Sequence, residues 1–588
     1  MKKVFGKILE KIIQLTERQR LVLLAILVGL CSGFAAVILK TGVKYVSLLL
    51  DKITVDKYNF MYLIFPGIGM LISMLLVKYV VKENLSHGIT KVLYAISRKK
   101  SRLSSKSIWG PLITSIITIG FGGSVGAEAP IVHSGASIGS YIAQKFKLNY
   151  HQITLLLVCG AAGSIAGIFK APLAGIIFSI EILMFDFSLS SITPLLLSSV
   201  TAICISYFLI GNDMPFAASV TAFQMSNIPY YIILGILCGL MSLYFIKVSL
   251  WLEAKIGRIE NPYRKLLTCA VFLGVIIFLF PPLYGEGYSS LASMLNNDVD
   301  SSFAHTFYSS FASNSGWFVV VFWTFVMFAK VFSMSLTNAG GGVGGTFGPT
   351  LVIGGICGFV LSRFFNLTGW ISLPEANFAL AGMGGLMAGV MHAPMTGIFL
   401  IAEITGGYEL IIPLIITVAL SYLITNSEEK HSIYTKRLAM EGDLLTHDKD
   451  KAVLTLLDVR QVLETDLDKV YPTDSLRYLV EVVSTSHRNL FPVVDRNGKY
   501  QGLLTLDDIR SIMFDNSKYD TVFVKDLMHA DTEKIVSTDN METVMEKFTK
   551  SNAWNLAVVD ENGKYLGMVS KSKIFSAYRE QLKEVSEA

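Results

Sequence analysis

The strongest constraint on the fold of this chain is an internal repeat. Residues 160–182 (GAAGSIAGIFKAPLAGIIFSIEI) align without gaps with residues 382–404 (GMGGLMAGVMHAPMTGIFLIAEI), 222 positions later. A second alignment, at an offset of 219, pairs Pro130 with Pro349. So many matched glycines and prolines predict two structurally equivalent halves. The identical pairs are Gly160/Gly382, Gly163/Gly385, Ala166/Ala388, Gly167/Gly389, Ala171/Ala393, Pro172/Pro394, Gly175/Gly397, Ile176/Ile398, Glu181/Glu403 and Ile182/Ile404, with Gly135/Gly354 and Gly139/Gly358 in the second alignment.

Both copies of the repeat lie in a part of the chain that is poor in charge. The 588 residues are 52% hydrophobic and 16% charged, whereas soluble domains are about 25% charged. Charges are scarce up to about Ile424, and residues 448–588 have the composition of a soluble protein. The sequence therefore predicts a multi-pass α-helical membrane domain over residues 1–441 and a linker over 442–465. A cytosolic α+β pair of domains is expected over 466–515 and 525–588.

Apolar spans divide the membrane part into helices, and several are shorter than the ~20 residues that cross a bilayer. Short, glycine-interrupted spans in both halves indicate half-helices that meet at a central site. A basic segment, residues 1–20, precedes the apolar run 21–38, which predicts a retained first helix with a cytoplasmic N-terminus. The later spans are 62–81, 108–121, 131–146, 153–169, 173–185, 192–210, 230–252, 266–280, 317–336, 346–364, 378–391, 395–404 and 410–424.

One carboxylate stands alone in the first half. Glu128 is the only charged residue from Ser107 through Gln144, within the stretch Gly122-Gly-Ser-Val-Gly-Ala-Glu-Ala-Pro130. A carboxylate at this depth is costly to desolvate and marks an ion or proton pathway. The glycines free backbone N–H groups, and Pro130 favours a helix N-terminus, which attracts anions. The carboxylate would compete for the same place and so act as a gate; the alternative is a carboxylate that only caps the helix.

The repeat-related stretch, Gly340-Gly-Gly-Val-Gly-Gly-Thr-Phe-Gly-Pro349, carries no carboxylate. A duplicated pair of broken helices could direct two N-termini at one anion. The alternative is that these glycines allow close packing between membrane helices. Both interpretations apply to such a stretch.

Four motifs resemble those of the CLC family of chloride channels and proton/chloride exchangers. Gly126-Ala-Glu-Ala-Pro130 resembles the family's G(K/R)EGP, and Gly345-Thr-Phe-Gly-Pro349 resembles GxFxP. Ser86-His-Gly-Ile-Thr90 stands in the place of GSGIP, and Tyr434 resembles the tyrosine of the last membrane helix. The resemblance covers residues 21–440. It implies an inverted-repeat bundle in the cell membrane, with both termini cytoplasmic, and a homodimer in which each subunit has its own pore.

The resemblance also implies roles for individual residues. Glu128 would be the gate, and chloride would be the transported ligand. The anion would be bound by backbone N–H groups and by a phenol, which let it bind and still leave. The implied anion-binding residues are His87, Gly88, Ile89, Thr346, Phe347 and Tyr434.

The chain departs from the family pattern at three informative positions. Ala127 replaces the basic residue before the gate, which weakens the field that attracts anions. His87 replaces a serine, and its side chain would either bind the anion or point away and leave binding to backbone amides. Ile182 stands where exchangers carry an inner glutamate that delivers protons. We therefore expect a channel-like chloride pathway, with a proton/chloride antiporter as the alternative.

Glu181 and Glu403 have a plainer interpretation. They are related by the repeat and follow short apolar segments. We expect both to hydrogen-bond backbone at helix ends.

The tail contains a second repeat, at an offset of 65, with a strand, an Asn-Gly turn, a second strand and a helix in each copy. It resembles a tandem of cystathionine-β-synthase (CBS) domains. The family pattern for an adenine nucleotide is met by Gly502, Thr505 and Asp508, but Lys573 replaces the acid in the second copy. At most one side of the cleft is thus equipped for a nucleotide; the alternative is a purely structural pair.

Several other classes are disfavoured. The net charge is +5 without a basic-aromatic patch for nucleic acid, and six cysteines without a CxxC pair need neither disulfides nor zinc. A CBS-regulated cation transporter would need several membrane carboxylates, and the pore region carries essentially one. The sequence has no nucleophile-base pair and no metal cluster at a recognisable spacing, so nothing in it indicates an enzyme. We expect no resident metal or required cofactor, and lipid as the surrounding partner.

Overall fold

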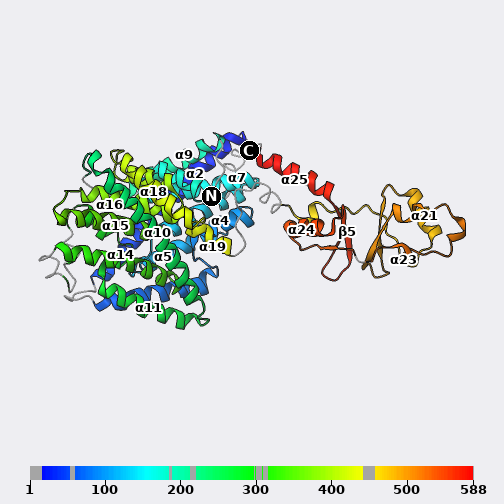
Figure 1. Ribbon diagram of the computed structural model, residues 1–588, viewed down its shortest axis with the longest axis horizontal. Helices are drawn as coiled ribbons and strands as arrows, with labels where there is room; N and C mark the ends of the chain where they lie inside the picture. Colours follow the sequence, from blue (N-terminus) through cyan, green and yellow to red (C-terminus); the bar gives the residue numbers. More distant parts are fainter. Residues whose placement is uncertain are drawn as a thin grey trace, which may run out of the picture. The chain divides into compact units, whose positions relative to one another are not determined.

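The computed structural model describes residues 16–52, 60–184, 189–211, 220–296, 298, 303, 308, 316–440, 457–530 and 532–586. The chain divides into two compact units, Met1–Leu444 and Leu445–Ala588. Residues 1–15 of the predicted N-terminal segment lie outside the described residues, as do 442–456 of the predicted linker. Figure 1 shows the helical bundle of the first unit and the smaller α+β unit that follows it in the chain.

The regular elements described in the first unit are all helices, and the helices of its two halves follow one another in the same order. The first half contains α2 (Glu17–Asp51), η1 (Phe60–Leu63), α3 (Phe65–Leu75), η2 (Leu76–Val81), α4 (Gly88–Arg98), α5 (Lys106–Gly120), α6 (Glu128–Lys145), α7 (Tyr150–Phe169), α8 (Pro172–Glu181) and α9 (Leu189–Ile210). The second contains η3 (Met225–Asn227), α10 (Ile228–Gly257), α11 (Pro262–Leu279), η4 (Pro281–Leu283), α12 (Tyr288–Leu295), α14 (Gly316–Ala339), α15 (Phe347–Thr368), α16 (Glu375–Met391), α17 (Pro394–Ile404), α18 (Ile411–Glu428) and α19 (Ile433–Met440).

Nine helices among the described residues are long and apolar enough to cross a membrane. The predicted spans coincide with helices to within a few residues, and the multi-pass fold is confirmed. Three spans differ: the helix that contains 21–38 continues to Asp51, 62–81 is divided among η1, α3 and η2, and 173–185 ends as a helix at Glu181. The helices α4, α12 and α19 were not among the predicted spans, because they are short and their sequences contain charged residues or several serines.

Glycines bring the central helices of each half into backbone contact. A Cβ on Gly135 of α6 would overlap the carbonyl oxygen of Gly160 in α7, and a Cβ on Gly354 of α15 would overlap that of Gly382 in α16. These residues are partners in the repeat, so the same close packing is built twice. In Figure 1, α15 and α16 lie side by side within the bundle. The packing interpretation of the stretch 340–349 is confirmed at Gly340, where a Cβ would lie 2.7 Å from Cys269 Cβ in α11.

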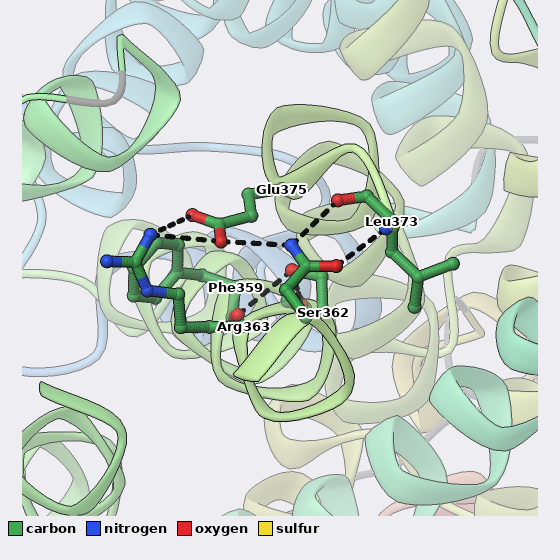
Figure 2. A network of polar contacts seen from close by, with 7 residues as sticks. Phe359, Ser362, Arg363, Leu373 and Glu375 are labelled. Atoms are coloured by element: carbon green, nitrogen blue, oxygen red, sulfur yellow. Dashed lines mark hydrogen bonds and ion pairs between the residues drawn. The ribbon is translucent and has the colours of Figure 1, made fainter. Parts of the chain in front are cut away.

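The turn between α15 and α16 is held by a polar network (Figure 2). Glu375 accepts hydrogen bonds from Arg363 at 3.1 Å and from Asn366 at 3.1 Å. Asn366 also exchanges two hydrogen bonds with the backbone of Leu373, at 2.6 and 3.0 Å. This network ties the C-terminal end of α15 to α16, and the opposite end of α15 carries the site described below.

The second unit contains two copies of a strand, turn, strand and helix. In the first copy β1 (Leu490–Val494) pairs antiparallel with β2 (Tyr500–Thr505), and α22 (Leu506–Arg510) follows. In the second, β4 (Asn555–Val559) pairs antiparallel with β5 (Tyr565–Ser570), and α25 (Lys571–Ser586) follows. Both Asn-Gly turns place their glycine at positive φ, as the last position of a three-residue hairpin loop requires.

The remaining elements complete this α+β pair, as the tail repeat predicts. Buried apolar side chains form one cluster around β1 and one around β4, and a third cluster combines residues of both copies. The additional elements are η6 (Val459–Gln461), α21 (Leu476–Thr485), η7 (Asn516–Lys518), α23 (Val524–Leu527), β3 (Lys534–Val536) and α24 (Met541–Ser551).

Candidate functional site

Glu128 is the first residue of α6, and its side chain is fully buried. Its Oε2 accepts the backbone N–H of Gly348 at 3.1 Å, and its Oε1 accepts the hydroxyl of Tyr288. Gly348 is the second residue of α15, so the carboxylate lies at the N-terminus of the repeat-related helix. A helix N-terminus is where an anion is stabilised. The carboxylate therefore does more than cap its own helix.

The two glycine-rich stretches pair directly. Gly126 donates its N–H to the carbonyl of Gly345 at 3.0 Å, and Gly345 donates to the carbonyl of Gly126 at 2.7 Å. These glycines are equivalent in the repeat, at the offset of 219 that pairs Pro130 with Pro349. The exchange fixes the N-termini of α6 and α15 beside each other, as expected for half-helices that meet at one site.

Thr346, Phe347 and Tyr434 come together at the N-terminus of α15. Thr346 precedes this helix, and its hydroxyl donates to the Tyr434 hydroxyl at 3.0 Å. The Phe347 ring is buried, with ring centroids 5.5 Å from Phe169 and 6.1 Å from Phe178. Thr346 and Phe347 directly precede Gly348, which holds the Glu128 carboxylate, and Tyr434 reaches this N-terminus through Thr346.

His87, Gly88 and Ile89 form the N-terminus of α4, with His87 at a φ of +57°. A Cβ on Gly88 would lie 2.7 Å from the carbonyl oxygen of Ala129, so this N-terminus reaches the first turn of α6. The structure therefore brings a third helix N-terminus to the Glu128 region.

The His87 imidazole faces another side chain, Glu253 of α10, with 3.9 Å between Nε2 and Oε2. Arg437 of α19 binds the same carboxylate at 2.6 and 3.2 Å. Of the two interpretations of His87, this arrangement favours the one in which backbone amides, rather than the imidazole, line the site.

A second carboxylate lies beside the gate, which corrects the expectation of essentially one. Glu286 accepts the backbone N–H of Ala127 at 3.2 Å and is within electrostatic reach of Glu128. It lies in the turn between η4 and α12, flanked by Gly285 and Gly287, both at positive φ. No periodicity surrounds such a turn, so the sequence offered no reason to place it here.

Lys330 of α14 was also missed. It is fully buried, and its Nζ donates to Ser124 Oγ at 2.8 Å and to the carbonyl of Gly285 at 3.0 Å. Lys330 is a lone cation within the apolar span 317–336. The argument that singles out Glu128, a lone charge at membrane depth, would have found it.

The capping role expected for Glu181 and Glu403 is confirmed, and it is reciprocal. Glu181, at the end of α8, accepts the N–H groups of Met395 at 2.9 Å and Thr396 at 2.7 Å in α17. Glu403, in α17, accepts those of Leu173 at 3.0 Å and Ala174 at 2.8 Å in α8. Ile182 follows α8 directly and is buried.

In the second unit, Thr505 and Asp508 lie together at the start of α22. Asp508 accepts the N–H and the hydroxyl of Thr505 at 2.8 and 2.7 Å, and its other oxygen lies 2.9 Å from His529 Nε2. The Asp508 carboxylate is therefore already bound on both oxygens. Among the residues that the structure describes, no group of three or more His, Cys, Asp or Glu residues could hold a metal ion.

The fold and this site define a multi-pass membrane protein in which three helix N-termini surround a buried glutamate. The sequence profile described as "Voltage gated chloride channel" matches residues 68–426, and the CBS domain profile matches residues 459–515 and 524–580. The chain belongs to the voltage gated chloride channel family and carries a C-terminal pair of CBS domains.

Relatives of known name agree with this assignment. An H(+)/Cl(-) exchange transporter ClcA from Vibrio cholerae is 32% identical over 317 residues, which cover 51% of this chain and 62% of the relative. The ClcA of Yersinia pestis is 28% identical, covering 74% of this chain and 90% of the relative. Chloride channel protein CLC-f of Arabidopsis thaliana is 26% identical, covering 73% and 61%. The chain thus spans less than two thirds of the length of the Vibrio relative.

Solved structures share the fold. That of a slow cyanobacterial Cl-/H+ antiporter superposes with a TM-score of 0.62 at 24% identity, covering 73% of this chain and 99% of the other. That of a eukaryotic CLC transporter gives a TM-score of 0.59 at 19% identity, covering 94% and 98%.

Proposed function

We propose that this protein conducts chloride passively across a membrane through a pore that the Glu128 carboxylate closes. One observation carries the proposal: the buried carboxylate accepts the N–H of Gly348 at the N-terminus of α15. A carboxylate there occupies a place suited to an anion. When it is protonated it loses its charge and can leave the place to chloride.

The surroundings suit a permeant anion. The donors proposed to bind it are the N–H groups of Gly88, Ile89, Thr346 and Phe347 and the Tyr434 hydroxyl. Partial positive charges of this kind bind an anion without a deep Coulomb well, so that it can also leave. Chloride is named in the relatives described above, and it is the anion we assign to this chain.

Passive conduction rests on Ile182. A coupled exchanger needs a group that passes protons from the cytoplasmic side to the gate, and an isoleucine side chain cannot hold a proton. Proton/chloride exchange is the second candidate, and it is favoured by the name of the Vibrio and Yersinia relatives.

Replacement of the gate residue tests the assignment of Glu128. Purified protein in liposomes loaded with chloride should release it faster at low pH, because protonation opens the gate. Glu128→Gln should release chloride at a high rate that no longer varies with pH. Flux through Glu128→Gln that keeps the wild-type pH dependence would refute the gate assignment.

Three further properties belong to this proposal. We infer a homodimer with one pore in each subunit, placed in the cell membrane with both termini in the cytoplasm. We assign adenine nucleotide as the ligand class of the CBS pair, held by Thr505 and Asp508. Because His529 and Thr505 bind Asp508 already, the ribose hydroxyls would replace His529. Calorimetric titration with ATP should show binding that Asp508→Asn abolishes; equal binding by this variant would contradict the site.

A further inference from the structure

A short segment lies alongside residues 122–128, here called the gate stretch, over their whole length. Residues 283–288, here called the clasp, connect η4 to α12 and make four hydrogen bonds to residues 122–128. The N–H of Gly285 donates to Gly122 at 3.1 Å, and Ser124 Oγ donates to the carbonyl of Leu283 at 2.7 Å. The other two bonds, from Ala127 to Glu286 and from Tyr288 to Glu128, reach the gate itself.

Two further contacts hold the clasp in place, one from the Lys330 side chain and one from the close packing of Tyr284 against Gly122. Lys330 donates both to Ser124 of the gate stretch and to Gly285 of the clasp, so one buried cation joins the two segments. The Tyr284 ring lies where a Cβ on Gly122 would be. A segment fixed in this way presents Tyr288 to Glu128 in a set position.

We propose that the clasp sets how firmly the gate is closed, with Tyr288 as the positioning residue that holds the Glu128 carboxylate at the N-terminus of α15. The inference rests on the proposed function, in which this position closes the pore. It adds a residue that no motif in the sequence identifies.

The phenol of Tyr288 favours the closed gate for an electrostatic reason. A hydrogen bond from a neutral hydroxyl to a carboxylate is charge-assisted and stronger than one between neutral groups. Protonation of Glu128 removes that advantage, so the bond stabilises the deprotonated, closed state over the protonated one. Loss of the hydroxyl should therefore let the gate open at higher pH.

Other charged and titratable groups act on the same carboxylate. Glu286 of the clasp and Tyr434 of α19 are within electrostatic reach of Glu128. The cations near Glu286 are Lys330 of α14 and Lys40 of α2. None of these groups is itself replaced in Tyr288→Phe, so this variant tests the Tyr288 hydroxyl.

The test measures chloride efflux from liposomes between pH 4.5 and 8 for the wild type, Tyr288→Phe, Glu128→Gln and the double variant. Losing one charge-assisted bond should move the midpoint of the efflux profile of Tyr288→Phe upward by about one pH unit. The double variant should match Glu128→Gln, because Tyr288 acts through Glu128. Tyr244→Phe is the matched control: the Tyr244 hydroxyl, on α10, donates to the backbone carbonyl of Phe328 in α14 at 3.4 Å, and the variant should keep the wild-type profile.

The outcomes separate the clasp from the proposed function. A Tyr288→Phe profile that coincides with the wild type, while Glu128→Gln loses its pH dependence, overturns the clasp and leaves the gate intact. A double variant that differs from Glu128→Gln also overturns it. Gel filtration checks folding, and Tyr288→Leu, which loses the same donor, must shift the midpoint in the same direction. Wild-type protein without chloride efflux overturns the proposed function itself.

Discussion

Glu181 and Glu403 lie at the C-terminal ends of α8 and α17, and each carboxylate caps the N-terminus of the other helix. The carboxylate at the end of α8 binds the first N–H groups of α17, and the carboxylate in α17 binds those of α8. The two halves of the repeat thus make equivalent hydrogen bonds to each other. This exchange gives both carboxylates a structural role.

Removing either carboxylate should lower stability, and by unequal amounts. Glu403→Ala leaves two N–H groups without their acceptor, at a cost of about 1–3 kcal/mol. Glu181→Ala should cost more, because Glu181 also accepts the Thr396 hydroxyl at 2.6 Å. Thermal unfolding in detergent measures both against Glu409→Ala, whose side chain is exposed. A larger loss for Glu403→Ala would contradict the account.

A methyl group at Gly126 should displace the gate. A Cβ there would overlap Glu128 Oε2 and lie 2.8 Å from the Gly348 nitrogen, so the carboxylate could not keep its place. We expect Gly126→Ala to raise chloride efflux at pH 7.5 toward the level of Glu128→Gln. Gly407→Ala, where a Cβ has nothing within 4 Å, should leave efflux unchanged. If chloride efflux through Gly126→Ala at pH 7.5 stayed as low as in the wild type, the Glu128 carboxylate would not be the group that closes the pore.

The His87 side chain should matter little for anion affinity. Its imidazole faces Glu253 at 3.9 Å, and we assign anion binding to the backbone of Gly88 and Ile89. Loss of a direct hydrogen bond to the anion would weaken binding roughly fivefold. We expect His87→Ser to change the half-saturating chloride concentration by less than about twofold on the same scale. A fivefold or larger change would place the imidazole on the anion.

Asp508 should stabilise the first CBS domain at neutral pH and lose this effect in acid. Burial raises the pKa of its carboxyl, but the hydrogen bonds from Thr505 and His529 outweigh burial and leave the pKa below its usual value. Because the pKa of this carboxyl is lower in the folded domain than in the unfolded chain, where it is about 3.9, the carboxylate stabilises the folded domain at pH values above about 3.9. This stabilisation is lost as the pH falls through the pKa of the folded domain.

Hydrogen exchange of α22 in the full chain measures this. Corrected for intrinsic rates, Asp508→Asn should lower protection at pH 6 and much less at pH 3. Asp507→Asn on the same helix serves as the control, since Asp507 pairs only with the exposed Arg510 in an i, i+3 bridge at 3.0 Å. Equal losses at both pH values would show that the carboxylate charge plays no part.

The sequence predicted the elements that have periodic or repeated signals. The apolar spans, the capping by Glu181 and Glu403, and the grouping of Thr346, Phe347 and Tyr434 all followed from hydropathy, the repeat or the family motifs. The clasp did not, because Glu286 and Tyr288 lie in a glycine-flanked turn far along the chain from Glu128. Contacts of that kind arise from tertiary packing, which neither a motif nor a period encodes.

The position of His87 was also beyond the sequence. Whether its side chain met the anion depended on Glu253, which is placed beside it only by the packing of α10 against the site. Lys330 is different, because a single lysine inside an apolar span was visible in the sequence.

The most direct test of passive conduction follows protons and chloride together. Liposomes containing the purified protein receive a chloride gradient, and the external pH is recorded while valinomycin carries potassium. We predict that chloride flows down its gradient and that the external pH shows no movement of protons against their own gradient. Uphill proton movement in a fixed ratio to chloride would contradict the account and establish the chain as an exchanger.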